Sequence, residues 1–214
     1  MKTIHLITAA AGLAIVAGCA TQAMGPSEAE VDAAANAALK SSFTEKGIAK
    51  LDRLQQDAVQ KACSGDKAPP AEVTAKLEAE QMASIKWPSD GQWLGDWKAG
   101  EKLAQNGRGM TWSDPAGAKS GGNCYNCHQM AKAEISFGTI GPSLYQYGKI
   151  RGVTDPASPA SQAIVKYTWG KIYNAKAYSA CSNMPRFGHV GVLDEGQIRD
   201  LMALLLDPKS PVNQ

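Results

Sequence analysis

Hydrophobic residues in the first half of the chain recur with helical spacing. From Ser27 to about Gly65 the sequence is rich in Ala, Glu, Lys and Gln, and Ser27 is a candidate N-cap. The stretch FTEKGIAKLDRLQQDAVQKAC predicts an amphipathic helix that ends near Cys63. The residues on its apolar face are Ile48, Leu51, Leu54, Ala58 and Val59.

Two more helices are predicted before the middle of the chain. PAEVTAKLEAEQMASI follows the break SGDKAPP and predicts a helix that starts at Pro70 or Ala71. Its inward residues are Val73, Leu77 and Met82. A tryptophan-rich change of composition at residues 86–97 marks a domain boundary, and DWKAGEKLAQNGRG then predicts a short helix from about Asp96 to Asn106.

The C-terminal segment LDEGQIRDLMALLLDP predicts the last helix, with Asp194 as N-cap and Pro208 as its stop. Its broad apolar face consists of Ile198, Leu201, Met202, Leu204 and Leu205. Because the chain shows no alternation of strands with helices, we expect an all-α fold.

Composition and charge do not indicate a class of binding partner. The 214 residues are 44% hydrophobic and carry 22 basic and 20 acidic side chains, for a net charge of +2. This balance is ordinary for a globular protein and favours neither nucleic acid nor an anionic membrane surface.

The N-terminus carries an export signal. Lys2 precedes an apolar run of about a dozen residues, which is short for a bilayer span. VAGC at residues 16–19 matches a lipobox, in which Cys19 is lipidated and becomes the new N-terminus; the alternative is a cut after Ala23. We therefore assign residues 1–23 to the signal and expect a periplasmic protein, with a lipid anchor on Cys19 if the lipobox is used.

Export changes what the five cysteines can do, because exported thiols meet an oxidising compartment. Cys19 belongs to the signal, and Cys124 and Cys127 belong to the motif CYNCH. By parity, Cys63 and Cys181 are left to form one disulfide.

Three chemistries compete for Cys124, Cys127 and His128. A structural zinc site lacks its second close pair of ligands, and a redox dithiol does not require the histidine. Covalent attachment of one haem c uses all three residues, since C-x-x-C-H places two thiols for thioether bonds and a histidine for the iron.

The second axial position has two main candidates. Met184 lies in CSNMPRFG, where Pro185 stiffens the backbone, and His189 is its rival in the same segment. On the proximal side, the carbonyl of Pro142 in GTIGPSL is a candidate acceptor for the ring N–H of His128.

These motifs together resemble SoxX, the small c-type cytochrome subunit of the SoxAX complex of thiosulfate oxidation. The resemblance rests on GEKLAQNGRGMTW, GGNCYNCHQ, GTIGPSL, NMPRFG and LDEGQIRDLMALLLDPKSPVN. It implies a class I cytochrome c-like domain over residues 88–214, preceded by a helical extension over residues 24–87. Cys124 and Cys127 would then attach the haem, and His128 and Met184 would ligate its iron.

The same resemblance implies a heterodimer with a SoxA-like subunit. That enzyme couples thiosulfate to a cysteine of the SoxYZ carrier, and this chain would pass electrons on to a downstream cytochrome without binding substrate. The alternative is a free-standing periplasmic electron carrier.

Overall fold

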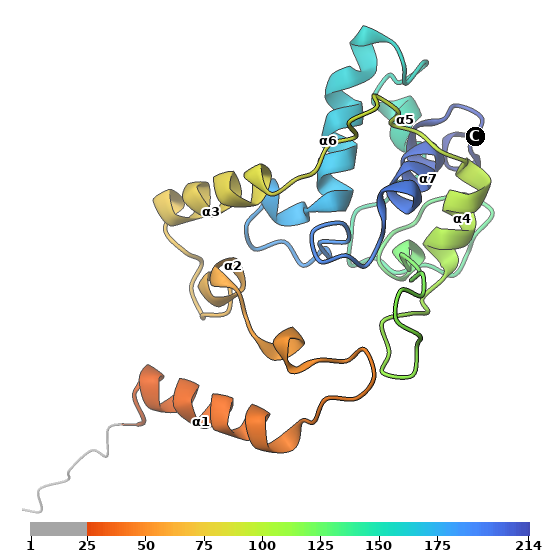
Figure 1. Cartoon of the computed structure of the whole chain (residues 1–214). Helices are drawn as coiled ribbons and strands as arrows, with labels where there is room; N and C mark the ends of the chain where they lie inside the picture. The colour runs from red at the N-terminus through yellow and green to blue at the C-terminus, as the bar shows by residue number, and fades with distance from the viewer. Residues whose placement is uncertain (1–24) are drawn as a thin grey trace, which may run out of the picture. The chain divides into compact units, whose positions relative to one another are not determined.

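The computed structural model describes residues 25–214, and over this range the regular elements are helices (Figure 1). The α-helices are α1 (Glu28–Ser42), α2 (Ala58–Ala62), α3 (Ala71–Ala83), α4 (Trp97–Gln105), α5 (Tyr147–Ile150), α6 (Gln162–Tyr173) and α7 (Glu195–Leu206). Short 3-10 turns are η1 (Leu51–Leu54), η2 (Cys124–Asn126), η3 (Pro159–Ser161), η4 (Ala175–Ala177) and η5 (Pro211–Asn213). The all-α prediction is confirmed for this range. Within it, no helix combines the length and hydrophobicity that a bilayer span requires.

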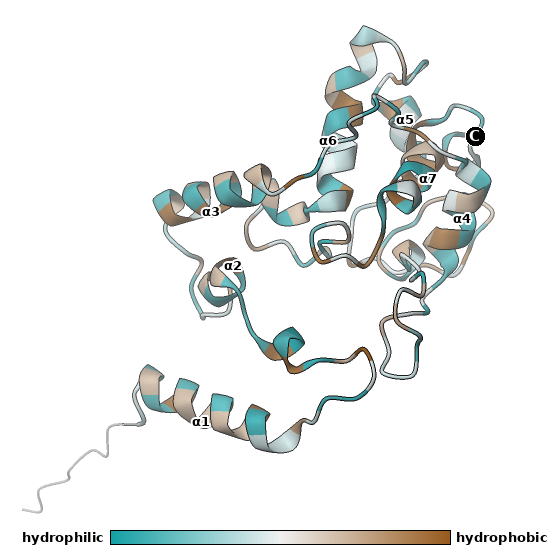
Figure 2. Ribbon diagram, viewed as in Figure 1, coloured by the Kyte–Doolittle hydropathy of each residue, from teal (hydrophilic) through white to brown (hydrophobic). Residues whose placement is uncertain are grey.

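The chain divides into two compact units at Ser42 and Phe43. In the first unit, α1 has no buried residue, and Figure 2 shows hydrophilic and weakly hydrophobic positions interspersed along it. The second unit runs from Phe43 to Gln214. Residues 43–87, predicted to belong to the extension, therefore share one compact unit with residues 88–214.

The core of the second unit is built on α7. Every apolar residue predicted for its inner face is at most 6% exposed: Ile198, Leu201, Met202, Leu204 and Leu205. The helix begins at a capping box, in which Asp194 accepts from the backbone N–H of Gln197 and the Gln197 side chain accepts from the backbone N–H of Asp194. Trp169 of α6 lies in the same core and donates from its indole N–H to the carbonyl of Lys86 at 2.9 Å.

Helix α4 packs on α7 at very close range. Gly95 donates to the carbonyl of Arg199, and the backbone N–H of Asp96 donates to the Asp200 carboxylate, both at 2.9 Å. A Cβ on Gly100 would overlap the backbone of Asp200. The glycine is therefore needed for contact between the two helix backbones.

The prediction of one amphipathic helix that ends near Cys63 is largely wrong. Residues 43–57 hold the turn η1 and an isolated backbone bridge between Lys46 and Ala49, and a new helix, α2, starts only at Ala58, with Asp57 as its N-cap. Tertiary contacts replace the helical ones, because Arg53 donates to the carbonyl of Met110 at 2.8 Å and Lys46 lies 3.4 Å from the centre of the Trp112 ring.

Other local predictions are mixed. Leu77 is buried as expected in α3, but Val73 is 41% exposed, so its inward assignment is wrong. The CYNCH motif forms a 3-10 turn. Helix α6 was not predicted, although its buried residues Val165, Thr168, Trp169, Ile172 and Tyr173 recur at the spacing of a single helix face.

Gly100→Ala tests the α4–α7 contact. The added methyl group has to push apart two helix backbones, so the free energy of unfolding should fall by about 1–3 kcal/mol in chemical denaturation. Gly196→Ala in α7 is the matched control, because its Cβ meets nothing closer than Asp194 at 3.4 Å. That control should gain about 0.5–1 kcal/mol. Equal effects for the two variants contradict the close contact.

Candidate functional site

The CYNCH motif forms a tight turn. Asn123 adopts a left-handed conformation, with φ at +49°, and the turn η2 follows it. Cys127 and His128 both donate their backbone N–H to the carbonyl of Cys124, at 3.1 and 2.9 Å. One turn of backbone therefore carries both thiols and the imidazole.

The orientation of His128 is fixed by a carbonyl. Its Nδ1 lies 2.7 Å from the oxygen of Pro142. Because a carbonyl only accepts, Nδ1 carries the hydrogen and Nε2 keeps a lone pair for a metal. A Cβ on Gly141 would overlap the imidazole ring, so this position requires glycine.

The segment that carries Pro142 is attached to the motif through backbone hydrogen bonds. Gly138 donates to Tyr125, and Gly141 donates to Cys127, both at 2.8 Å. Leu144 donates to the carbonyl of Gln129 at 2.7 Å. These bonds hold the acceptor of His128 in place without regular secondary structure.

The two thiols of the motif are not bonded to each other. Burial raises the pKa of the Cys124 thiol to about 12. A redox dithiol needs a thiolate at neutral pH, which this environment disfavours. Among the residues that the structure describes, no cluster of three or more His, Cys, Asp or Glu could hold a metal ion, and this disfavours zinc.

Met184 is half-buried and packs against the same hydrophobic core as Cys124. Its backbone N–H donates to the hydroxyl of Ser182 at 3.2 Å. Met130 and Met202 are 1% and 0% exposed, so core packing accounts for both.

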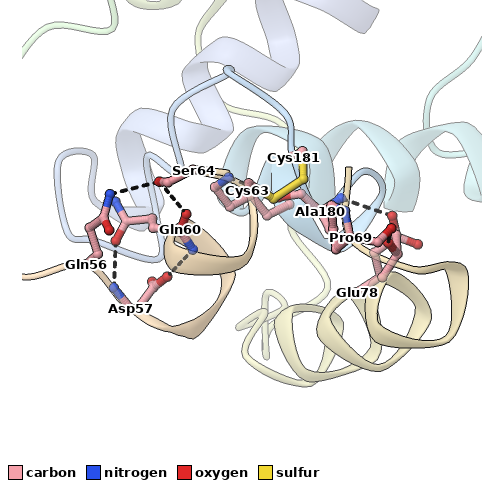
Figure 3. The surroundings of a disulfide bond; sticks show 11 residues. Gln56, Asp57, Gln60, Cys63, Ser64, Pro69, Glu78, Ala180 and Cys181 are labelled. Atoms are coloured by element: carbon pink, nitrogen blue, oxygen red, sulfur yellow. Dashed lines mark hydrogen bonds between the residues drawn. A yellow bond between two sulfur atoms is a disulfide. The ribbon is translucent and has the colours of Figure 1, made fainter. Parts of the chain in front are cut away.

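The Met184 loop, residues 180–189, is bound to the N-terminal part of its unit by a disulfide. Cys63 and Cys181 are joined, as the cysteine count predicts, with their Cα atoms 5.3 Å apart (Figure 3). Beside the bridge, Ala180 donates its backbone N–H to Glu78 of α3 at 3.0 Å.

Polar contacts bind the other end of this loop. The guanidinium of Arg186, only 8% exposed, lies 2.6 Å from the Asp57 carboxylate and donates to the side-chain oxygen of Gln81 at 3.1 Å. Burial favours a higher pKa for Asp57, but the hydrogen bond from Gln60 and the charge of Arg186 outweigh it and lower the pKa. The ion pair is therefore formed at neutral pH.

His189 is engaged by the same part of the chain. Its Nδ1 lies 3.0 Å from the hydroxyl of Ser84, at the end of α3. Burial and the nearby charge of Arg186 lower its pKa, so the ring is neutral at pH 7. As with His128, this hydrogen bond engages Nδ1 alone, so it does not exclude His189 as the rival of Met184 for the iron.

A haem would also bring two propionates, for which the sequence offers six donor residues: Arg108, Trp112, Tyr145, Tyr147, Trp169 and Arg186. Four of them, Tyr145, Tyr147, Trp169 and Arg186, already form hydrogen bonds to other protein groups. Within residues 25–214 the side-chain donors of Arg108 and Trp112 have no such partner.

One polar pair near the motif was missed by sequence reasoning. Tyr125, between the two cysteines, is 5% exposed, and its hydroxyl donates to the carboxylate of Glu101 at 2.9 Å. Nothing in the local sequence links two residues 24 positions apart. Only the packing of α4 against η2 brings them together.

Over residues 25–214, fold and site define an all-α protein with a CxxCH turn and one disulfide. No family model matches the chain. The chain is 38% identical over 180 residues to an uncharacterized lipoprotein of Aquifex aeolicus (strain VF5), covering 80% of this chain and 82% of that protein. The chain belongs to the family of this lipoprotein.

The resemblance to SoxX is therefore corrected. The relative that spans most of the chain is a lipoprotein of no stated activity, and no family model supports the assignment. Short motifs such as C-x-x-C-H recur wherever the same attachment chemistry is used, so they do not identify a subfamily. The heterodimer with SoxA and the SoxYZ carrier were inferred from this resemblance alone and are dropped with it.

Cys63→Ser with Cys181→Ser tests the disulfide. The bridge closes a loop of 118 residues, so its removal should lower the free energy of unfolding by about 2–5 kcal/mol. Denaturation with and without reductant checks this, since reductant should destabilise only the wild type. A wild type that does not respond to reductant contradicts the bridge.

Proposed function

We propose that the chain is an electron-transfer protein that carries one covalently bound haem c at Cys124, Cys127 and His128. The hydrogen bond from His128 Nδ1 to the oxygen of Pro142, at 2.7 Å, is the observation that carries the proposal. It leaves Nε2 free as a ligand and fixes the ring, as metal-binding histidines require.

The surroundings of the motif fit this group better than its rivals. The half-buried Cys124 packs its thiol against the hydrophobic core, which suits a thioether to a porphyrin and disfavours a thiolate. Gly141 keeps the face of the imidazole clear of a side chain. The haem supplies one-electron exchange when bound; the chain attaches it, orients it and shields it from water.

Met184 is the proposed second axial ligand. It is half-buried at the edge of the core and Pro185 follows it, while the contacts of Cys181 and Arg186 restrain its loop. His128 and Met184 would together hold the iron, and this ligand pair favours electron transfer over binding and conversion of a substrate. The proposal is thus an electron carrier of the class I cytochrome c type.

We place this carrier in the periplasm, attached to a membrane through lipidated Cys19. Cys19 lies outside the residues that the structure describes, so the support comes from the lipobox VAGC and from the lipoprotein relative. Residues 20–42 would then separate the lipid from the compact unit that begins at Phe43.

An alkaline pyridine haemochrome spectrum of the chain matured in a periplasm tests the cofactor. We expect one haem c per chain, and Cys124→Ser with Cys127→Ser should lose covalent haem because no thioether can form. A matured wild type without Soret absorbance overturns the proposal.

Met184→Ala tests the axial ligand. The variant should keep its covalent haem but lose the weak sulfur-to-iron band of the ferric spectrum, because the thioether is gone. Met110→Ala is the matched control, since Met110 is 36% exposed. An unchanged ferric spectrum in Met184→Ala excludes this methionine as the ligand.

Cys19→Ser tests the anchor. We expect the full-length chain to incorporate labelled fatty acid and to sediment with membranes, and the variant to do neither, because the acylated thiol is missing. A mature wild type that starts at Met24 supports cleavage after Ala23 instead.

A further inference from the structure

The carboxylate of Glu101 in α4 is only partly satisfied. Its Oε1 accepts from the hydroxyl of Tyr125 at 2.9 Å and from the side-chain amide of Gln105 at 3.1 Å. Its Oε2 is buried and has no hydrogen-bond partner within residues 25–214. A buried oxygen without a partner disfavours the ionised form of the group that carries it.

The charged groups around Glu101 do not offset the negative charge of its carboxylate. Burial is the main cause that raises its pKa, the hydrogen bond from Tyr125 acts in the opposite direction, and the negative charge of Glu134 raises the pKa further. Gln105 and Tyr125 are neutral donors, and Glu101 is in no ion pair within the described residues. Protonation is therefore the simplest way to neutralise the Glu101 carboxylate.

Tyr125 connects this carboxyl group to the CYNCH turn. It lies between Cys124 and Cys127, and its hydroxyl donates to Glu101 while accepting from the backbone N–H of Ala131 at 3.2 Å. Its carbonyl accepts from Gly138, which begins the segment that carries Pro142. Glu101 is thus one side chain away from the turn that would hold the haem.

We propose that Glu101 is a proton-binding site coupled to the redox state of the group held by Cys124 and Cys127. When an external one-electron donor reduces the site, the added negative charge favours uptake of one proton from solvent, and the Glu101 carboxylate becomes a carboxylic acid. Oxidation reverses both steps. No bond other than O–H forms or breaks, and the inference rests on the proposed function.

Redox titration of the matured, haem-loaded chain over a range of pH tests the coupling. We expect the reduction potential of the wild type to fall as pH rises through the titration of Glu101, and Glu101→Gln to lose this dependence. Tyr125→Phe should move the pH-dependent region to higher pH, because it removes the hydrogen bond that stabilises the carboxylate. Glu28→Gln, exposed on α1, is the matched control and should behave as the wild type.

The pH dependence of unfolding gives a second measurement on the same variants. Because the pKa of Glu101 is raised on folding, its contribution to stability is complete below the ordinary value of 4.5 and is lost as pH rises through the folded value. Glu101→Gln should lack this loss, and Tyr125→Phe should extend it to higher pH.

The two measurements separate the possible failures. A pH-dependent potential that is lost only in Glu101→Gln supports the coupling. A potential that is independent of pH in the wild type, or that depends on pH equally in Glu101→Gln, overturns it although haem is present. Absence of haem c in the wild type overturns the proposed function, and with it the coupling, while the unfolding profiles still report whether Glu101 binds a proton.

Discussion

Burial of the apolar face of α7 is the constraint on which the rest of the second unit depends. Helices α4, α5 and α6 all contact it, and Gly100 lets the backbone of α4 lie directly against that of α7. A helix whose leucines are removed from water on nearly every side gives a rigid support for loops that have little structure of their own. The long segment between α4 and α5, which carries the CYNCH turn, is such a loop.

That turn is rigid without a long helix because its polar groups are paired locally. His128 and Cys127 share the carbonyl of Cys124, and residues 138–144, which include Pro142, return to donate three backbone N–H groups to residues 125–129. The result is an imidazole with one nitrogen assigned to a carbonyl and the other free. A metal-binding histidine needs this arrangement, in which one ring nitrogen donates to a carbonyl and the other is free to bind the metal.

The Met184 loop and the Glu101 pair show two further uses of distant parts of the chain. Residues 57–84 restrain the loop by a covalent bridge, an ion pair to the buried guanidinium of Arg186 and several hydrogen bonds, so the position of Met184 depends on a segment about a hundred residues earlier. The carboxylate of Glu101 is likewise held by a hydrogen bond from Tyr125, which lies 24 positions away in the chain.

The sequence by itself determined the elements whose chemistry is local. It predicted α4 and α7, whose caps and apolar faces lie within a dozen residues, the parity of Cys63 and Cys181, and the CYNCH motif with the carbonyl of Pro142 beside it. Only the tertiary structure decided that residues 43–57 do not form a long helix. Arg53 donates a hydrogen bond to Met110 and Lys46 lies over the ring of Trp112, and these contacts replace those of a helix. The same is true of the pair Glu101 and Tyr125: its energy comes from burial and from a contact between distant residues, and neither quantity is encoded in the spacing of neighbouring side chains.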